Sequence, residues 1–124
     1  RITLHDAVPS REMPEHMGRA GIVVLPSRTE GMGRVLLEAM ACEKPRIGSN
    51  IEGIPTVIND GVDGILVEPG SVESLVAALE ALMSSPDLRK RMGEEGKRRA
   101  ATEFDSDNYF RLMDEFLTQV LARR

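Results

Sequence analysis

Residues 22–41 read IVVLPSRTEGMGRVLLEAMA and contain the strongest fold signal in the chain. The first four, Ile22–Leu25, form a continuous apolar run rich in β-branched residues, which is typical of a strand buried on both faces. A loop, Ser27–Gly33, then leads into a helix that we expect over Arg34–Glu43, ended by Pro45. A buried strand, a glycine-containing loop and an apolar helix in this order predict a βα unit.

Strand and helix patterns alternate on both sides of this unit. Further short strands are expected at Ile2–His5, Arg46–Ser49 and Ile65–Val67. Helices are expected over Glu12–Arg19 after Ser10, as one turn at Pro55–Ile58, from Ser71 to Met83, from Ser85-Pro86 toward Ala101, and over Asp107–Ala122. Such alternation predicts an α/β fold with four short, mostly parallel strands in a doubly wound sheet and closing C-terminal helices.

The composition excludes several classes of protein. The chain has 124 residues, a size that fits one domain, and a net charge of -4, which is the wrong sign for a nucleic-acid-binding face. Its single cysteine, Cys42, rules out a disulfide framework and a cysteine-based zinc site. No apolar stretch approaches the length of a membrane span. Because a strand-like segment follows directly on Arg1, we expect a fragment of a longer protein.

The loop before the Arg34–Glu43 helix is a candidate anion site. Free N–H groups in the first helical turn and the positive end of the helix dipole suit a phosphate. Gly31 and Gly33 would let a ligand approach the backbone closely. A plain flexible βα loop is the alternative interpretation of the same pattern.

Two glutamates accompany this loop. Glu38 lies in a helix that is apolar on nearly every side, so its carboxylate should be paired or should face a ligand. Five residues beyond Gly33, it could accept hydrogen bonds from two ribose hydroxyls, and the alternative is an ion pair with Arg34. Glu30 would point into the same crevice, and the alternative is a solvent-facing loop acid.

The remaining chemically active side chains favour ordinary structural roles. His5 and His16 match no metal site or catalytic triad, and Cys42 fits an inert small side chain in a helix. Residues 59–64, NDGVDG, predict turns, because a calcium loop would need a glutamate where Gly70 stands. The cluster Lys97-Arg98-Arg99 is interpreted as a solvated helix face, with phosphate contact as a minor alternative.

The spacing of Glu30 and Glu38, within Pro-Ser-x-x-Glu-Gly-x-Gly-x-Val-Leu-Leu-Glu-Ala-Met-Ala, resembles the signature of family-four retaining glycosyltransferases of the GT-B class. The resemblance extends over nearly the whole chain. Residues 49–58 resemble the family's Gly-Gly-x-Pro-Glu-Val-Ile loop, residues 60–70 its next strand and turn, and residues 75–98 its closing helices.

This resemblance implies the C-terminal, donor-binding Rossmann-like region of a GT-B fold, with residues 1–124 as one partial domain whose N-terminal acceptor domain is absent. It implies that Glu30 contacts the donor sugar, as the catalytic candidate, and that Glu38 contacts the ribose. The implied contacts to pyrophosphate and sugar come from Gly31, Met32, Gly33, Arg34 and Val35. Those to the nucleobase come from His5, Asp6, Ala7 and Val8.

The expected partners are a nucleotide diphosphate sugar as donor, a glycan, lipid or small-molecule acceptor, and the N-terminal domain of the same parent chain. We expect no nucleic acid, no cofactor and no obligatory metal, and a cytoplasmic parent that can associate peripherally with the inner face of the membrane. The fragment alone should be inactive. The alternatives are a non-catalytic nucleotide- or phosphate-binding α/β module, or a nucleotide-sugar epimerase or phosphorylase of the same fold.

The chain departs from the family pattern in several places. Glu43 stands where the family usually has glycine, Arg46 where it has a hydrophobic residue, and Thr56 where it has glutamate, so Thr56 receives no role. The basic residues that clamp the diphosphate in the family belong to a segment that would precede Arg1.

Overall fold

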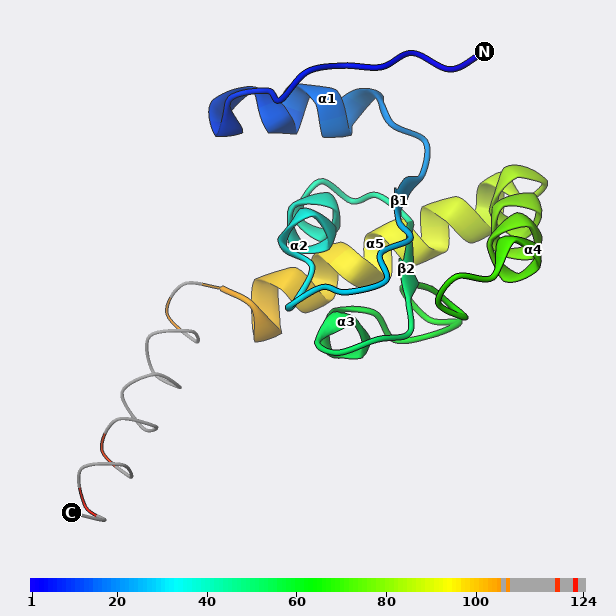
Figure 1. The fold of residues 1–124 in the computed structure, drawn as a ribbon. Coiled ribbons are helices and arrows are strands. Elements are labelled where there is room, and N and C mark those ends of the chain that lie inside the picture. The colour runs from blue at the N-terminus through cyan, green and yellow to red at the C-terminus, as the bar shows by residue number, and fades with distance from the viewer. Residues whose placement is uncertain (106, 108–117, 119–121, 123–124) are drawn as a thin grey trace.

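The computed structural model describes residues 1–105, 107, 118 and 122 (Figure 1). Its elements are, in chain order, the 3-10 turn η1 (Ser10–Glu12), α1 (Met13–Arg19), β1 (Val23–Leu25), α2 (Arg34–Ala41), β2 (Arg46–Ser49), α3 (Ile54–Val57), β3 (Gly64–Val67), α4 (Val72–Met83) and α5 (Pro86–Glu103). The helix predicted over Asp107–Ala122 lies almost wholly outside the described residues.

The strands form one parallel sheet in the order β1-β2-β3, which confirms the predicted α/β class. Val24 pairs with Ile47, and Ile47 pairs in turn with Ile65. The predicted fourth strand, Ile2–His5, is wrong: residues 1–9 have no regular structure, and the side chains of Ile2 and Leu4 are exposed. A strand needs a neighbouring ladder, and the three strands of the described chain pair only with one another.

Each face of the sheet has its own core. On one face Ile47 and Val67 pack with α4 and α5 through Ala78, Leu82 and Met92. On the other face α2 and α3 pack together through Leu36, Ile54, Val57 and Ile58. Because successive strand residues point to opposite faces, Gly48, next to Ile47, lies directly under α3. α1 adds Met17 against Val23 and Ala39, and stands outermost beside α2 (Figure 1).

The polar helix starts are partly as predicted. Ser71 and Ser85 each accept a hydrogen bond from the backbone N–H three residues later, so both predicted N-caps are confirmed. Ser10 makes no side-chain cap. It begins η1, and α1 follows only at Met13 with Pro14 in its first turn. Among the described residues, no helix combines the length with the apolar composition that a membrane span requires.

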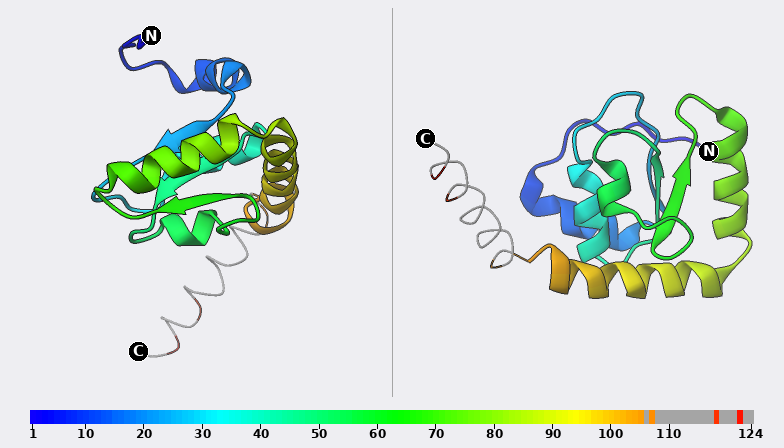
Figure 2. Two further views of the ribbon diagram at one scale, coloured as in Figure 1. Left: turned by 90° about the vertical axis from the view of Figure 1, so that its right-hand side faces the viewer. Right: turned by 90° about the horizontal axis from the view of Figure 1, so that it is seen from below.

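α5 crosses the end of the sheet at which the strands begin, here called the amino edge (Figure 2, right). Two buried glycines of this helix allow the close approach. A Cβ atom on Gly93 would collide with the backbone carbonyl of Glu43, and one on Gly96 would lie 3.1 Å from the Arg46 guanidinium. α5 therefore closes the amino edge and leaves the opposite edge uncovered by this helix.

Three charged side chains lie buried beneath α5 and form the ionic cluster: Arg46 at the start of β2, Asp63 just before β3, and Arg99 on α5. Asp63 bonds both guanidiniums, with Arg46 Nη2 3.0 Å from its Oδ1, and also accepts the Asn59 N–H at 2.9 Å. Arg46 Nη1 donates to the Val57 carbonyl at 2.7 Å. These contacts tie the two strand starts to α3 and α5.

Burial and the neighbouring polar groups shift the pKa values of the two arginines of the cluster in opposite directions. Burial lowers the pKa of Arg46 and outweighs the attraction of Asp63. Burial also opposes the charge on Arg99, but hydrogen bonds to Glu103 and Asp63 hold the pKa of Arg99 above its ordinary value. Arg99 is therefore a buried ion, which corrects the solvated-face interpretation of Lys97-Arg98-Arg99: only Lys97 and Arg98 are exposed.

Candidate functional site

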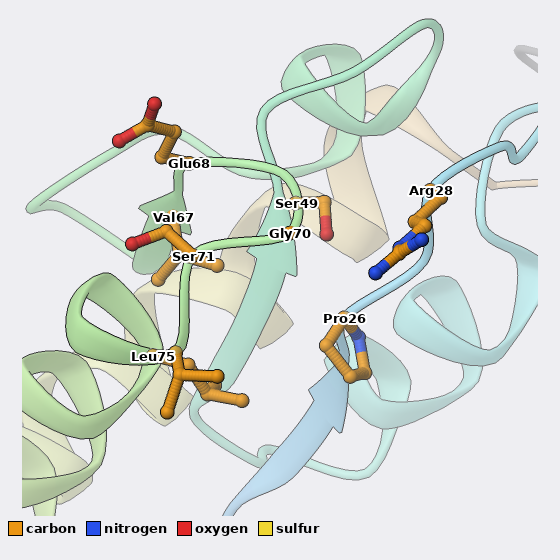
Figure 3. A pocket seen from close by; sticks show the side chains of 9 residues that line it. Pro26, Arg28, Ser49, Val67, Glu68, Gly70, Ser71 and Leu75 are labelled. Carbon is orange, nitrogen blue, oxygen red and sulfur yellow. The ribbon is translucent and has the colours of Figure 1, made fainter.

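The strands end together at the carboxyl edge of the sheet, after Leu25, Ser49 and Val67. An open cavity of about 200 Å³ lies there, lined by Pro26, Arg28, Ser49, Val67, Glu68, Gly70, Ser71, Val72 and Leu75. Figure 3 shows Pro26 and Arg28 on one side of it, the β3–α4 segment on the other, and Ser49 between them at the end of β2. Ligands of open α/β sheets bind beyond this edge, so the structure places a hollow where the topology predicts one.

Next to this cavity lies the glycine loop, residues 27–33, which connects β1 to α2. Two hydrogen bonds hold it against the segment after β2. The Glu30 N–H donates to the Glu52 carboxylate at 2.7 Å, and the Gly53 N–H donates to the Gly31 carbonyl at 2.9 Å. The two backbones touch closely, since a Cβ on Gly53 would lie only 2.5 Å from the Gly31 oxygen. The loop therefore rests on residues 52–53.

The start of α2 has the features of an anion site. Gly33 is its N-cap, with a left-handed φ of 77° that favours glycine, and no side chain caps the helix. The next N–H groups, of Arg34 and Val35, belong to the first turn, which has no carbonyl partner within the helix. The dipole of this eight-residue helix has its positive end at this position. The arrangement suits a phosphate group held by the backbone.

The two glutamates of the sequence motif lie in different surroundings. Glu30 is half-buried, and its carboxylate accepts the Ser27 hydroxyl at 3.3 Å. Glu38 lies 3.5 Å from the exposed guanidinium of Arg34, so the ion pair weighed as an alternative is present. No hydrogen bond or ion pair joins Glu30 to Glu38 in the described chain.

α2 is also less buried than its composition predicts. Leu36, Ala39 and Met40 are buried, but Ala41 is exposed and the Glu38 side chain keeps 34% of its surface exposed. Glu38 lines a second hollow, between α1 and α2, together with Arg34, Met13 and Met17. Glu38 therefore needs no buried partner, and a ligand role for it rests on its position beside the start of α2.

The other predicted site residues lie at the surface. His5, Asp6 and Ala7 are exposed and Val8 is half-buried, all in the irregular segment before η1. Met32 is exposed on the glycine loop. Among the departures from the family named above, Glu43 pairs with Lys97, Arg46 belongs to the ionic cluster, and the Thr56 hydroxyl donates to the Gly53 carbonyl at 2.5 Å.

Sequence reasoning missed three residues at this edge: Arg28, Ser49 and Glu52. The signal was available for Ser49 and Glu52, because both follow β2 and the ends of parallel strands meet at one edge. Within residues 1–105, 107, 118 and 122, no group of three or more potential metal ligands comes together. The groups at the site include backbone N–H groups, carboxylates, the Ser49 hydroxyl and the guanidiniums of Arg28 and Arg34.

Comparison with protein families decides the relationship. The family model of the glycosyl transferases group 1 matches residues 1–99. The chain belongs to this family. Curated relatives of this group 1 chain include an exopolysaccharide phosphotransferase of Streptomyces coelicolor, 37% identical over 99% of the chain and 14% of the relative. Another is the alpha-D-kanosaminyltransferase of Streptomyces kanamyceticus, 35% identical over 76% of the chain and 24% of the relative.

Solved structures support the same assignment. An Anabaena protein, HepE, crystallised with UDP and glucose, matches with a TM-score of 0.81 and 25% identity over 87% of the chain and 30% of its own. The C-terminal domain of a group 1 glycosyl transferase from Francisella tularensis matches with a TM-score of 0.75 and 31% identity over 83% of the chain and 53% of its own. The chain spans 14–30% of the length of the curated relatives it matches. The group 1 chain thus has the fold of GT-B glycosyltransferase structures.

Proposed function

We propose that this chain is the donor-binding part of a retaining glycosyltransferase of family four, which moves a sugar from a nucleotide diphosphate sugar to a hydroxyl acceptor. The observation that carries the proposal is the uncapped start of α2 behind the glycine loop, at the carboxyl edge of a group 1 domain. Relatives named as glycosyltransferases favour an enzyme over a non-catalytic binding module. The HepE structures with UDP and with UDP-glucose support a nucleotide sugar as the donor.

The leaving diphosphate is the group that this geometry can stabilise. As the bond between sugar and diphosphate breaks, negative charge grows on the phosphate oxygens. The N–H groups of Arg34 and Val35 and the dipole of α2 favour that charge without moving. We expect this end of the helix, with basic residues from elsewhere in the parent protein, to hold the diphosphate without an obligatory metal or cofactor.

The two glutamates then contact different parts of the donor. Glu30, on the loop before the helix, hydrogen-bonds the sugar hydroxyls and orients the sugar toward the acceptor. Glu38 accepts hydrogen bonds from the ribose with the carboxylate edge that does not face Arg34. The nucleobase contacts come from residues 5–8. The acceptor, the N-terminal domain and a cytoplasmic location near the membrane belong to the parent protein and are part of the proposal.

The experiment uses the complete protein that contains this chain. Thermal-shift screening against UDP-, GDP- and ADP-sugars should raise the melting temperature with one of them, because a ligand bound by the native state stabilises it. No shift with any nucleotide sugar would contradict the proposal. Residues 1–124 alone should transfer no sugar, since catalysis needs an acceptor held against the donor.

Substitution of each glutamate separates the two roles. Glu38→Ala should weaken binding of the donor and of the free nucleoside diphosphate alike, by about 1–3 kcal/mol for the lost charged hydrogen bonds. Glu30→Ala should leave nucleoside diphosphate affinity nearly unchanged and lower turnover, because it acts on the sugar. Calorimetry with the free nucleotide and kinetics with the intact donor measure the two effects. Equal loss of nucleotide affinity in both variants would refute this assignment.

A further inference from the structure

Glu52 combines an unfavourable backbone conformation with a contact to the glycine loop. In the described chain, two residues other than glycine have a positive φ: Glu43 at 60° and Glu52 at 46°. This left-handed conformation is costly for a residue with a Cβ atom, and persists where the surrounding structure holds it. Glu43 ends the turn after α2 and pairs with Lys97 of α5. Glu52 instead lies at the carboxyl edge.

The left-handed turn at Glu52 brings two consecutive groups to the loop. Its carboxylate accepts the Glu30 N–H at 2.7 Å, across 22 residues of sequence. The N–H of the next residue, Gly53, donates to the Gly31 carbonyl at 2.9 Å. Together the two bonds hold the peptide group before Glu30 and the peptide group after Gly31. Glu30 is the residue whose side chain we assign to the donor sugar.

We propose that Glu52 is a positioning residue: by holding the Glu30 N–H it fixes the direction of the Glu30 side chain toward the donor sugar. This inference rests on the proposed function. The Glu52 carboxylate accepts a hydrogen bond from the N–H of Glu30, which lies three residues before the N-cap. It does not occupy the N–H groups of Arg34 and Val35, which we assign to the diphosphate. Its effect should therefore fall on the sugar and spare the nucleotide.

The contact needs an acceptor oxygen rather than a charge. A glutamine amide offers an oxygen at the same reach, whereas alanine and glycine offer none. Glu52→Gln should therefore keep the hydrogen bond from the Glu30 N–H, and Glu52→Ala should lose it. Glu52→Gly also loses this hydrogen bond, but it relieves the strain of the left-handed backbone at residue 52. A merely structural role predicts that stability and activity change together across this series, whereas a positioning role separates them.

The first test needs no donor. Hydrogen exchange of the peptide containing residues 27–33 is measured in the complete protein for the wild type and the three variants. The exchange rate should rise about fivefold or more in Glu52→Ala and Glu52→Gly, and stay near the wild-type rate in Glu52→Gln. Glu43→Gly is the matched control, because it removes a glutamate from the same backbone conformation away from the loop. Unchanged exchange in Glu52→Ala and Glu52→Gly would overturn the inference.

The second test measures release of nucleoside diphosphate from UDP-glucose, GDP-mannose or ADP-glucose, whichever stabilises the wild type. Glu52→Ala and Glu52→Gly should lower kcat about tenfold, with the affinity for the free nucleotide within about twofold of the wild type. Glu52→Gln and Glu43→Gly should keep the wild-type kcat. In a Glu30→Ala background, Glu52→Ala should add less than about a twofold change, because both act through one side chain.

The outcomes separate this inference from the function on which it rests. If Glu30→Ala lowers kcat and Glu52→Ala does not, the positioning role is wrong and the proposed function stands. If none of the nucleotide sugars stabilises the wild type, the proposed function fails, and hydrogen exchange still decides whether Glu52 holds the loop. A Glu52→Ala variant that binds the donor more tightly would overturn the inference, since the carboxylate would then compete with the ligand.

Discussion

The two edges of the sheet treat charged side chains in opposite ways. At the amino edge, Arg46 and Asp63 are fully buried and Arg99 is 5% exposed, and they bond one another. At the carboxyl edge, Arg28 lies exposed on a loop and lines the cavity. Buried charges are stable only when paired, whereas loop charges remain available to a ligand. The difference teaches that one edge holds the fold together and the other presents groups for binding.

α3 connects the two edges, although it has only four residues. At its start, Gly53 donates its N–H to the glycine loop. At its end, the Val57 carbonyl accepts the Arg46 guanidinium. The seat of the glycine loop therefore depends on a helix whose far end is fixed by the ionic cluster.

The largest expected effect comes from breaking the amino edge. Asp63→Ala leaves two buried guanidiniums without their shared partner and should destabilise the protein by about 3–5 kcal/mol. Denaturant unfolding of the complete protein measures it. Asp60→Ala is the control, because Asp60 lies in the same turn and accepts one backbone N–H at an exposed position. A similar loss in both variants would show that the cluster is not what distinguishes this edge.

The second largest effect is expected from adding a methyl group to Gly53 at the carboxyl edge. Gly53 has an ordinary φ of -80°, so Gly53→Ala tests only the contact that a Cβ would make with the Gly31 oxygen. Moving the glycine loop aside should cost about 1–3 kcal/mol of stability and weaken donor binding. Calorimetry against the donor and thermal unfolding measure the two losses. Gly21→Ala, where nothing lies within 4 Å, should change neither.

Sequence reasoning predicted some features of this molecule and missed others. The βα unit, the strands after it and the caps at Ser71 and Ser85 were predicted because apolar runs, prolines and serines act locally. Residues 2–5 show the limit of that reasoning, since an apolar run becomes a strand only beside another strand.

The ionic cluster could not be predicted either. Arg46, Asp63 and Arg99 are far apart in sequence, and their pairing follows only from the path of α5 across the sheet. At the candidate site, the loop, its glycines and the α2 start were predicted from local pattern. The seat formed by Glu52 and Gly53 depends on a contact across 22 residues. Long-range contacts between polar groups leave no periodic pattern in a sequence.

A smaller effect is expected from removing the serine that caps a helix near each edge of the sheet. Ser71→Ala and Ser85→Ala each remove an oxygen that accepts a first-turn N–H, and each should cost about 1 kcal/mol. Ser71 borders the cavity and Ser85 begins the helix that covers the amino edge. Thermal unfolding of the two variants should give equal shifts. A much larger shift for Ser85→Ala would show that the start of α5 is coupled to the ionic cluster.

The smallest effect is expected from exposed charges on the outer face of α5. A hydrogen bond from Arg98 lowers the pKa of Glu95 below its ordinary 4.5. The ionised form is thus favoured in the folded state, so this contribution is present above pH 4.5 and is lost as the pH falls through the lowered pKa. Glu95→Gln should flatten the acid limb of thermal stability slightly. An acid limb identical to that of the wild type would contradict this contribution.

Burial of the ionic cluster also restricts how the sequence can evolve. Replacing Arg46 by an apolar residue would remove one of the two guanidiniums that bond Asp63, and losing Asp63 would leave two cations together under α5. A larger residue in place of Gly96 would press on the Arg46 guanidinium, which lies 3.1 Å from where the Cβ would be. Single substitutions at these sites are therefore obstructed, and the residues should be inherited as a set. Among group 1 relatives, an arginine at this strand start should mark one lineage, recognisable by the aspartate, the glycine and the second arginine that accompany it.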